Sequence, residues 1–109
     1  MTVTFEVLAE PSRRRILDLL MEEERPVGAL VEALSISQPA VSKHLKVLRQ
    51  AGMVEARHDA QRRIYRVRTE PLREVDAWIA PYRRMWASSL TALERHLEIM
   101  EDNGDEGWH

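Results

Sequence analysis

The chain has 109 residues and a mass of 12.7 kDa, with 44% hydrophobic and 31% charged residues, which suits one folded domain and excludes a wholly disordered chain. It contains no cysteine, which excludes disulfides, thiolate metal sites and cysteine nucleophiles. The formal net charge of −2 conceals a basic centre, because residues 25–68 hold nine Lys or Arg residues against three acidic ones.

Apolar residues at helical spacing predict four helices in the first half of the chain. The first covers residues 4–9, and the second covers 11–23, where Pro11 suits the first turn. A short amphipathic helix over 27–34 follows the Arg25-Pro26-Val27-Gly28 break. The fourth helix covers 38–50, and a glycine stands just beyond its end, where helices commonly finish.

The hydrophobic period changes to two after this helix, which predicts a β-hairpin around Asp59-Ala60-Gln61. The turn lacks glycine, so its type stays open. From Pro71 the helical period returns and predicts a last helix over about 71–101. Pro81 is expected to kink this helix near Trp78. Residues 103–109 are acidic and contain glycine, and we expect them to form a flexible tail.

This order of elements predicts a mainly α fold with a small β-hairpin. Two short helices joined by three residues, followed by a hairpin, form a winged helix-turn-helix with about five helices and a two-stranded wing. We expect one DNA-binding and dimerisation domain over residues 1–102. The helix over 38–50 is then the recognition helix, and residues 54–68 form the wing.

The recognition helix has an inner stripe of Val41, Leu45 and Leu48 and a polar outer face. Gln38 stands at its N-terminus, where helix-turn-helix proteins reach base edges, and glutamine can form two hydrogen bonds to adenine. An ordinary surface helix carries the same residue types, so this helix alone does not decide. The residues expected to contact DNA are Ser37, Gln38, Pro39, Ser42, Lys43, His44, Lys46, Arg57, Arg62 and Arg63.

The hairpin favours DNA binding, because five of its arginines lie within twelve residues. A cationic hairpin beside a recognition helix suits phosphates or a minor groove. Arg62 and Arg63 lie at the expected tip and are assigned to DNA. Arg66 and Arg68 have two interpretations, DNA contact or pairing with acidic residues of the flanking helices.

Several runs of residues resemble ArsR/SmtB-type repressors. The opening LAEPSRRRIL (8–17), the SQPAVSKHLKVL of the recognition helix (37–48), AGMV (51–54) and RRIY (62–65) are similar to the family's motifs. The resemblance covers about residues 3–100. It implies a homodimer that binds double-stranded DNA at a palindromic or pseudo-palindromic operator and represses transcription there. It also implies that the dimer releases the DNA when an effector binds. Two positions depart from the family pattern, Ser35 in place of a common turn glycine and Val31 in place of alanine.

Metal sensing is not expected, although many members of the family bind metals. The cysteines that some relatives use are absent, and Trp78 stands where an Asp-x-His pattern needs histidine. His96 has no carboxylate three residues later. We therefore expect no metal and no cofactor. A metal-responsive repressor with an unrecognised site remains the alternative.

The last helix carries an apolar stripe longer than one small domain can cover, which predicts a homodimer. The expected interface residues are Phe5, Leu8, Ile79, Tyr82, Trp86, Leu90, Leu93 and Leu97. The cluster of Trp78, Tyr82 and Trp86 has two interpretations. It is either part of this interface or a pocket for a small apolar effector of unknown identity.

Other classes of protein fit the sequence poorly. No phosphate-binding loop, dinucleotide motif or Ser-His-Asp arrangement is present, so an enzyme is not expected. A winged-helix module that contacts proteins is the other alternative, which the basic recognition face and wing argue against. The sequence has no long apolar run and no secretory signal pattern at its start. We therefore expect no membrane contact and a cytoplasmic location.

Overall fold

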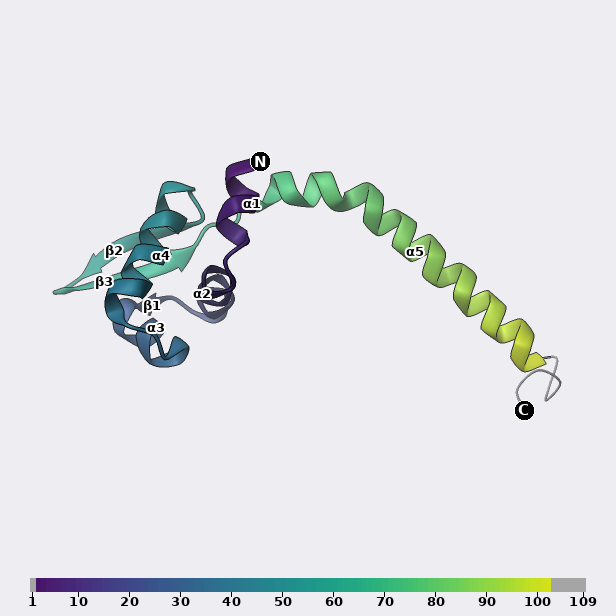
Figure 1. Ribbon diagram of the computed structural model, residues 1–109, viewed down its shortest axis with the longest axis horizontal. Coiled ribbons are helices and arrows are strands. Elements are labelled where there is room, and N and C mark those ends of the chain that lie inside the picture. The colour runs from purple at the N-terminus through teal and green to yellow at the C-terminus, as the bar shows by residue number, and fades with distance from the viewer. Residues whose placement is uncertain (1, 103–109) are drawn as a thin grey trace. The chain divides into compact units, whose positions relative to one another are not determined.

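The computed structural model describes residues 2–102, which form five helices and a three-stranded antiparallel sheet (Figure 1). The chain divides into two compact units, Met1–Val75 and Asp76–His109. The sheet and the first four helices belong to the first unit, and the last helix begins there and continues as the second. The winged helix-turn-helix fold is confirmed. The tail expected at 103–109 lies outside the described residues.

The four predicted helices of the first unit are present, and their ends agree with the sequence to within two residues. They are α1 (Thr2–Leu8), α2 (Pro11–Glu22), α3 (Val27–Leu34) and α4 (Gln38–Gln50). Helices α3 and α4 are the helix-turn-helix, and α4 is the recognition helix.

The sheet contains the predicted hairpin and one further strand. The wing consists of β2 (Val54–Asp59) and β3 (Arg62–Val67), and β1 (Arg25–Pro26) pairs with the free side of β3. Sequence analysis placed a break at β1. Because the residue before a proline is pushed towards extended conformations, the same signal that ends a helix also suits a strand.

The core lies where the apolar stripes of α2, α3 and α4 meet the base of the sheet. The predicted inner stripe of α4 is confirmed, since Val41, Leu45 and Leu48 are all buried. Full burial of such a side chain contributes about 1.5–3 kcal/mol, so these contacts fix which face of α4 points outwards. The largest fully buried side chains are Ile16, Leu30, Val41, Leu45, Leu48 and Met53.

Both ends of α4 are defined by local hydrogen bonds. At the start, the Ser37 side chain accepts a hydrogen bond from the Ala40 amide at 3.2 Å. At the end, Gly52 adopts a φ of 74°, its amide donates to the Arg49 carbonyl, and the Met53 amide donates to the Leu48 carbonyl. These two bonds form a Schellman motif, which satisfies carbonyls that the helix end would leave free.

Two other positions adopt left-handed backbone without being glycine. Ser35 ends α3 with φ 56° and ψ 38°, so it keeps the conformation for which many helix-turn-helix turns use glycine. Ala60 has φ 58° in the two-residue turn between β2 and β3. Positive φ at the first turn position, and not at Gln61, is the pattern of a type II′ turn.

Arginines of α2 hold the end of α1. The Arg13 Nε donates to the Val7 carbonyl at 2.7 Å, and an Arg14 guanidinium nitrogen donates to the Leu8 carbonyl at 2.6 Å. The last carbonyls of a helix have no partner within it. These arginines of the RRR run therefore act as side-chain caps that join two helices.

Helix α5 (Leu72–Asp102) begins in the first unit and forms the described part of the second. It matches the predicted last helix to within one residue. The helical assignment continues through Pro81, and the kink expected there stays a prediction. The rings of Trp78 and Tyr82 lie 5.2 Å apart between centroids, and Asp76 pairs with Arg83.

Candidate nucleic-acid interface

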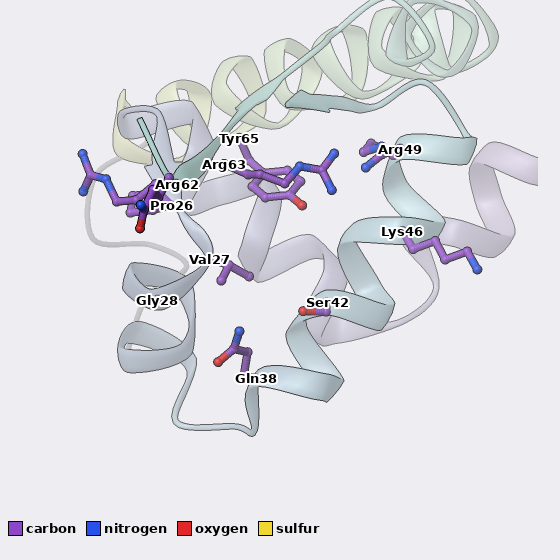
Figure 2. A pocket seen from close by; sticks show the side chains of 11 residues that line it. Pro26, Val27, Gly28, Gln38, Ser42, Lys46, Arg49, Arg62, Arg63 and Tyr65 are labelled. Carbon is purple, nitrogen blue, oxygen red and sulfur yellow. The ribbon is translucent and has the colours of Figure 1, made fainter. Parts of the chain in front are cut away.

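A groove of about 800 Å³ lies between the recognition helix, the start of α3 and the wing (Figure 2). It brings together five of the ten residues predicted to contact DNA, from α4 and from the wing tip. Its lining consists of Pro26, Val27, Gly28, Gln38, Ser42, Lys46, Arg49, Gln61, Arg62, Arg63 and Tyr65.

The groove uses a single row of side chains on α4. Gln38, Ser42 and Lys46 are spaced four residues apart, which places them one above another on the helix surface. Figure 2 shows Gln38 at the start of α4 and Lys46 further along it. Lys43 is exposed and lies about 100° further round the helix than Ser42. The groove therefore lies to one side of the polar surface, and Lys43 extends that surface beyond it.

The wing presents two different faces, because neighbouring residues of a strand point to opposite sides. We call the side with Arg63 and Tyr65 the groove face and the side with Glu55, Arg57 and Arg66 the outer face. Arg62 follows the alternation of the outer face, but it stands at the wing tip and lines the groove. On the groove face, Tyr65 is only 7% exposed, and the Arg63 guanidinium lies over its ring at 5.6 Å. A cation over an aromatic ring is attracted to it, so Tyr65 helps to orient Arg63.

On the outer face, carboxylates neutralise the arginines. Arg66 pairs with Glu55 on the opposite strand, and Arg68 pairs with the same Glu55 at 2.9 Å. Arg57 pairs with Glu24, which follows α2, at 2.7 Å. Arg66 and Arg68 are paired with carboxylates, but the partners named by that interpretation are wrong, because they come from the wing and from the segment before α5 instead of the flanking helices.

These ion pairs shift the pKa of the groups involved. The hydrogen bond from Arg68 to Glu70 lowers the pKa of that carboxyl and raises the pKa of Arg68. The hydrogen bond with Glu24 raises the pKa of Arg57 in the same way. Each shift favours the charged form of its group.

The cations at the groove and on the neighbouring surface of α4, unlike those of the outer face, have at most a long contact with a carboxylate of the described residues. Arg62 has only a long contact of 3.5 Å with Asp59. Four basic side chains of α4 and the wing form no ion pair with any described residue: Lys43, Lys46, Arg49 and Arg63. Unpaired cations around a concave surface are available to a polyanion.

The remaining predicted DNA contacts lie outside the lining of the groove. Ser37 caps α4, and Pro39 is exposed in its first turn. His44 is half-buried, and its Nδ1 is buried without a hydrogen-bond partner among the described residues. Arg57 is held by Glu24. Their contact with DNA stays a prediction.

Several residues that line the groove are not among the predicted DNA contacts. Arg49 follows Ser42 by seven residues, two helical turns, and this spacing was the available signal. Tyr65 and Pro26–Gly28 gave no signal, since their place in the groove depends on the pairing of β1 with β3.

The residues expected at the dimer interface are largely exposed within the described chain. On α5, Trp86 is 55% and Leu90 is 60% exposed, whereas Ile79 is half-buried. On α1, Phe5 is exposed, and Leu8 is half-buried against the core. Tyr82, Leu93 and Leu97 are exposed in the same way.

Two other findings concern metals and membranes. Within residues 2–102, His, Asp and Glu side chains nowhere gather in a group of three or more that could hold a metal ion. In the same range, no helix combines the length and apolar character needed to cross a bilayer.

A helix-turn-helix whose second helix borders a cationic groove, together with an arginine-bearing wing, defines a DNA-binding transcriptional regulator. Comparison with known proteins supports this class. Residues 10–56 match the family model described as "Bacterial regulatory protein, arsR family". The chain is 36% identical to the HTH-type transcriptional regulator Rv0081 of Mycobacterium tuberculosis over 101 residues, which cover 92% of this chain and 86% of that protein. The chain belongs to the ArsR family.

Other relatives agree with this assignment. The transcriptional repressor SdpR of Bacillus subtilis is 33% identical over 72% of this chain and 88% of its own length. The crystal structure of the ArsR family transcriptional regulator RHA00566 aligns with a TM-score of 0.69 at 27% identity, covering 79% of this chain and 94% of that one. HlyU from Vibrio cholerae aligns with a TM-score of 0.61 at 35% identity, covering 79% and 90%. Rv0081, SdpR and RHA00566 are named as regulators or repressors of transcription, not as enzymes.

Proposed function

We propose that the protein is a homodimeric repressor that binds a palindromic or pseudo-palindromic operator through α4 and the wing. The observation that carries this proposal is the groove that joins the recognition helix to the wing tip. It is bordered by Lys46, Arg49 and Arg63, which form no ion pair with any described residue. The proposed function involves no catalytic step, metal or cofactor. We propose that the protein acts in the cytoplasm.

Two kinds of side chain in the groove are proposed to contact different parts of the DNA. Gln38 and Ser42 lie in the first half of α4, which enters the major groove in helix-turn-helix proteins, and we assign them to base edges. Arg62 and Arg63 at the wing tip contact phosphates or the adjacent minor groove. Affinity then comes mainly from the arginines, and sequence preference comes mainly from α4.

A second copy of this chain is the proposed occupant of the apolar stripe on α5. Leu90, Leu93 and Leu97 lie at steps of three and four and are all exposed in the described chain. Soluble monomers rarely expose a continuous apolar surface of this length. We place the Trp78, Tyr82 and Trp86 cluster in the same interface, with Phe5 and Leu8 of α1 contributing. Two copies present two recognition helices, which must be about 34 Å apart to enter successive major grooves.

The operator proposal is tested by replacing Gln38. We expect Gln38→Ala to relax base preference at one position of each half-site, with a cost of about 1–3 kcal/mol there. The measurement is selection of bound sequences from a random duplex library, followed by affinity measurements on the selected site and its single-base variants. Lys43→Ala, outside the groove lining, is the matched control and should lower affinity without changing preference. An unchanged profile for Gln38→Ala removes this residue from base recognition.

The dimer proposal is tested by placing charge on the stripe. Leu90→Glu with Leu93→Glu would bury carboxylates at the interface, which is strongly unfavourable, and we expect a monomer by light scattering at micromolar concentration. Ser88→Glu with Thr91→Glu adds the same charge on exposed positions outside the stripe and should leave the dimer intact. A parent protein that is monomeric under these conditions contradicts the proposal.

A further inference from the structure

We propose that the groove between α4 and the wing also binds a small aromatic carboxylate, which competes directly with DNA. The competition with DNA rests on the proposed repressor function, whereas the binding of the carboxylate to the groove does not. The ligand would occupy the space over Val27 and Tyr65, with its carboxylate towards the start of α3 and the cations of the groove.

The first observation is the size and the apolar floor of the groove. Its volume of about 800 Å³ falls within the range of roughly 300–1,000 Å³ that is typical of small-molecule sites. Pro26, Val27 and Tyr65 form an apolar part of the lining, and Figure 2 shows Val27 between the wing residues and Gln38. A phosphate group offers no apolar surface to such a floor, but an aromatic ring does.

The second observation is the uncapped start of α3. The N-cap residue is Pro26, whose side chain has no atom that can accept a hydrogen bond from the first amides of the helix. A side chain added at Gly28 would meet nothing within 4 Å, so the backbone here faces open space on the groove. The free amides and the dipole at a helix N-terminus favour an anion.

The third observation is the set of arginines at the groove. Arg49 and Arg63 form no ion pair with any described residue, and both line the same cavity. In Figure 2 their guanidinium groups extend to the same side of the groove. Arg63 already lies over the Tyr65 ring, so a planar ligand finds an aromatic ring and a guanidinium in its lining. An apolar body with one negative charge matches this combination.

A ligand in this place would displace DNA without a change of conformation. It would cover Gln38 and Ser42, which the proposed function assigns to base edges, and it would neutralise Arg63. Competition for one site predicts that the apparent Kd for DNA rises in proportion to ligand concentration once the site is mostly occupied. The aromatic cluster of α5 is then free to serve the dimer interface.

The binding site is tested by titration calorimetry of the full chain with 2-naphthoate and with the neutral 2-naphthalenemethanol. We expect one naphthoate per chain and at least tenfold weaker binding of the alcohol.

Gly28→Asp places a carboxylate at the start of α3, where it suits the helix dipole, and should weaken naphthoate binding at least tenfold. Gly28→Asn has nearly the same size without the charge and should weaken it no more than threefold. Arg63→Gln should weaken it at least fivefold, and Arg66→Gln on the outer face should not.

Two results of these titrations would contradict the proposed carboxylate site. Equal binding of the acid and the alcohol, or equal effects of Gly28→Asp and Gly28→Asn, would overturn the site. Competition is measured by anisotropy of a labelled duplex. If the duplex binds and naphthoate does not, the acid site is refuted and the repressor proposal stands. If naphthoate binds with this pattern of variants and no duplex binds, the repressor proposal fails and the acid site stands.

Discussion

The two faces of the wing carry arginines in opposite electrostatic states. On the outer face, Arg57 and Arg66 are paired with Glu24 and Glu55. On the groove face, Arg63 lies over an aromatic ring and has no carboxylate partner among the described residues. A count of charges along the hairpin therefore overstates what DNA can use, because only part of the positive charge borders the groove.

The paired arginines of the outer face contribute little to stability. Solvent screens exposed ion pairs, and their side chains lose freedom when they pair, so such pairs add little to the free energy of unfolding. Their main effect is to neutralise charge on the side of the wing away from the groove. This difference between the faces leads to three predictions, in order of decreasing effect.

Removing the arginines at the groove should have the largest effect. In the Arg62→Gln and Arg63→Gln double variant, we expect the salt slope of DNA affinity to fall by about two units for each protomer, one for each lost phosphate contact, and therefore by about four units for the proposed dimer. At about 0.1 M salt, this corresponds to roughly a tenfold loss of affinity per arginine for any duplex. Fluorescence anisotropy across a salt series measures both quantities.

The matched control has the same change of charge on the outer face. Arg57→Gln with Arg66→Gln should change the slope by much less, because both arginines are already neutralised. Equal slopes for the two double variants would remove the distinction between the faces and would support Arg57 as a DNA contact.

Releasing an outer-face arginine should have a smaller effect of opposite sign. Glu55→Gln removes the carboxylate that holds both Arg66 and Arg68. We expect affinity for any duplex to rise a few-fold and the salt slope to steepen by up to about one unit. Glu32→Gln removes an acidic charge elsewhere in the first unit and serves as the control. A fall in affinity for Glu55→Gln would mean that its ion pairs hold the wing in place for binding.

The smallest effect concerns Glu70, whose pKa is lowered by the hydrogen bond from Arg68. A carboxyl with a folded pKa below its unfolded pKa contributes stability above the unfolded pKa and loses it as the pH falls through the folded pKa. Carboxyl titration by NMR should therefore give Glu70 a pKa below its ordinary value, and Arg68→Gln should return it towards that value. Arg66→Gln should leave the Glu70 pKa unchanged.

The helices were predictable because their signals are local. α4 has a capping serine, an inner stripe at helical spacing and a glycine after its end, and the structure uses all three. β1 was missed because two residues cannot show a period of two. Its pairing with Ile64 and Tyr65 depends on residues almost forty positions away.

The site was predictable to a smaller extent. Residue types indicated Gln38, Ser42, Arg62 and Arg63, because polar and cationic side chains on this arrangement of helix and hairpin suit a nucleic acid, and all four line the groove. The partner of each arginine was not predictable from order along the chain. Glu24 reaches Arg57 across thirty-three positions, and the groove floor exists only once β1 has joined the sheet.

The short strand β1 also affects how the sheet ends. A strand with an unpaired edge can recruit a strand from another molecule and start aggregation. One edge of this sheet is only two residues long and contains Pro26, which has no amide to donate. The other edge, β2, carries charges at Glu55, Arg57 and Asp59. Both edges therefore resist growth by strand addition, and we expect concentrated protein to remain free of intermolecular β-structure originating at the wing.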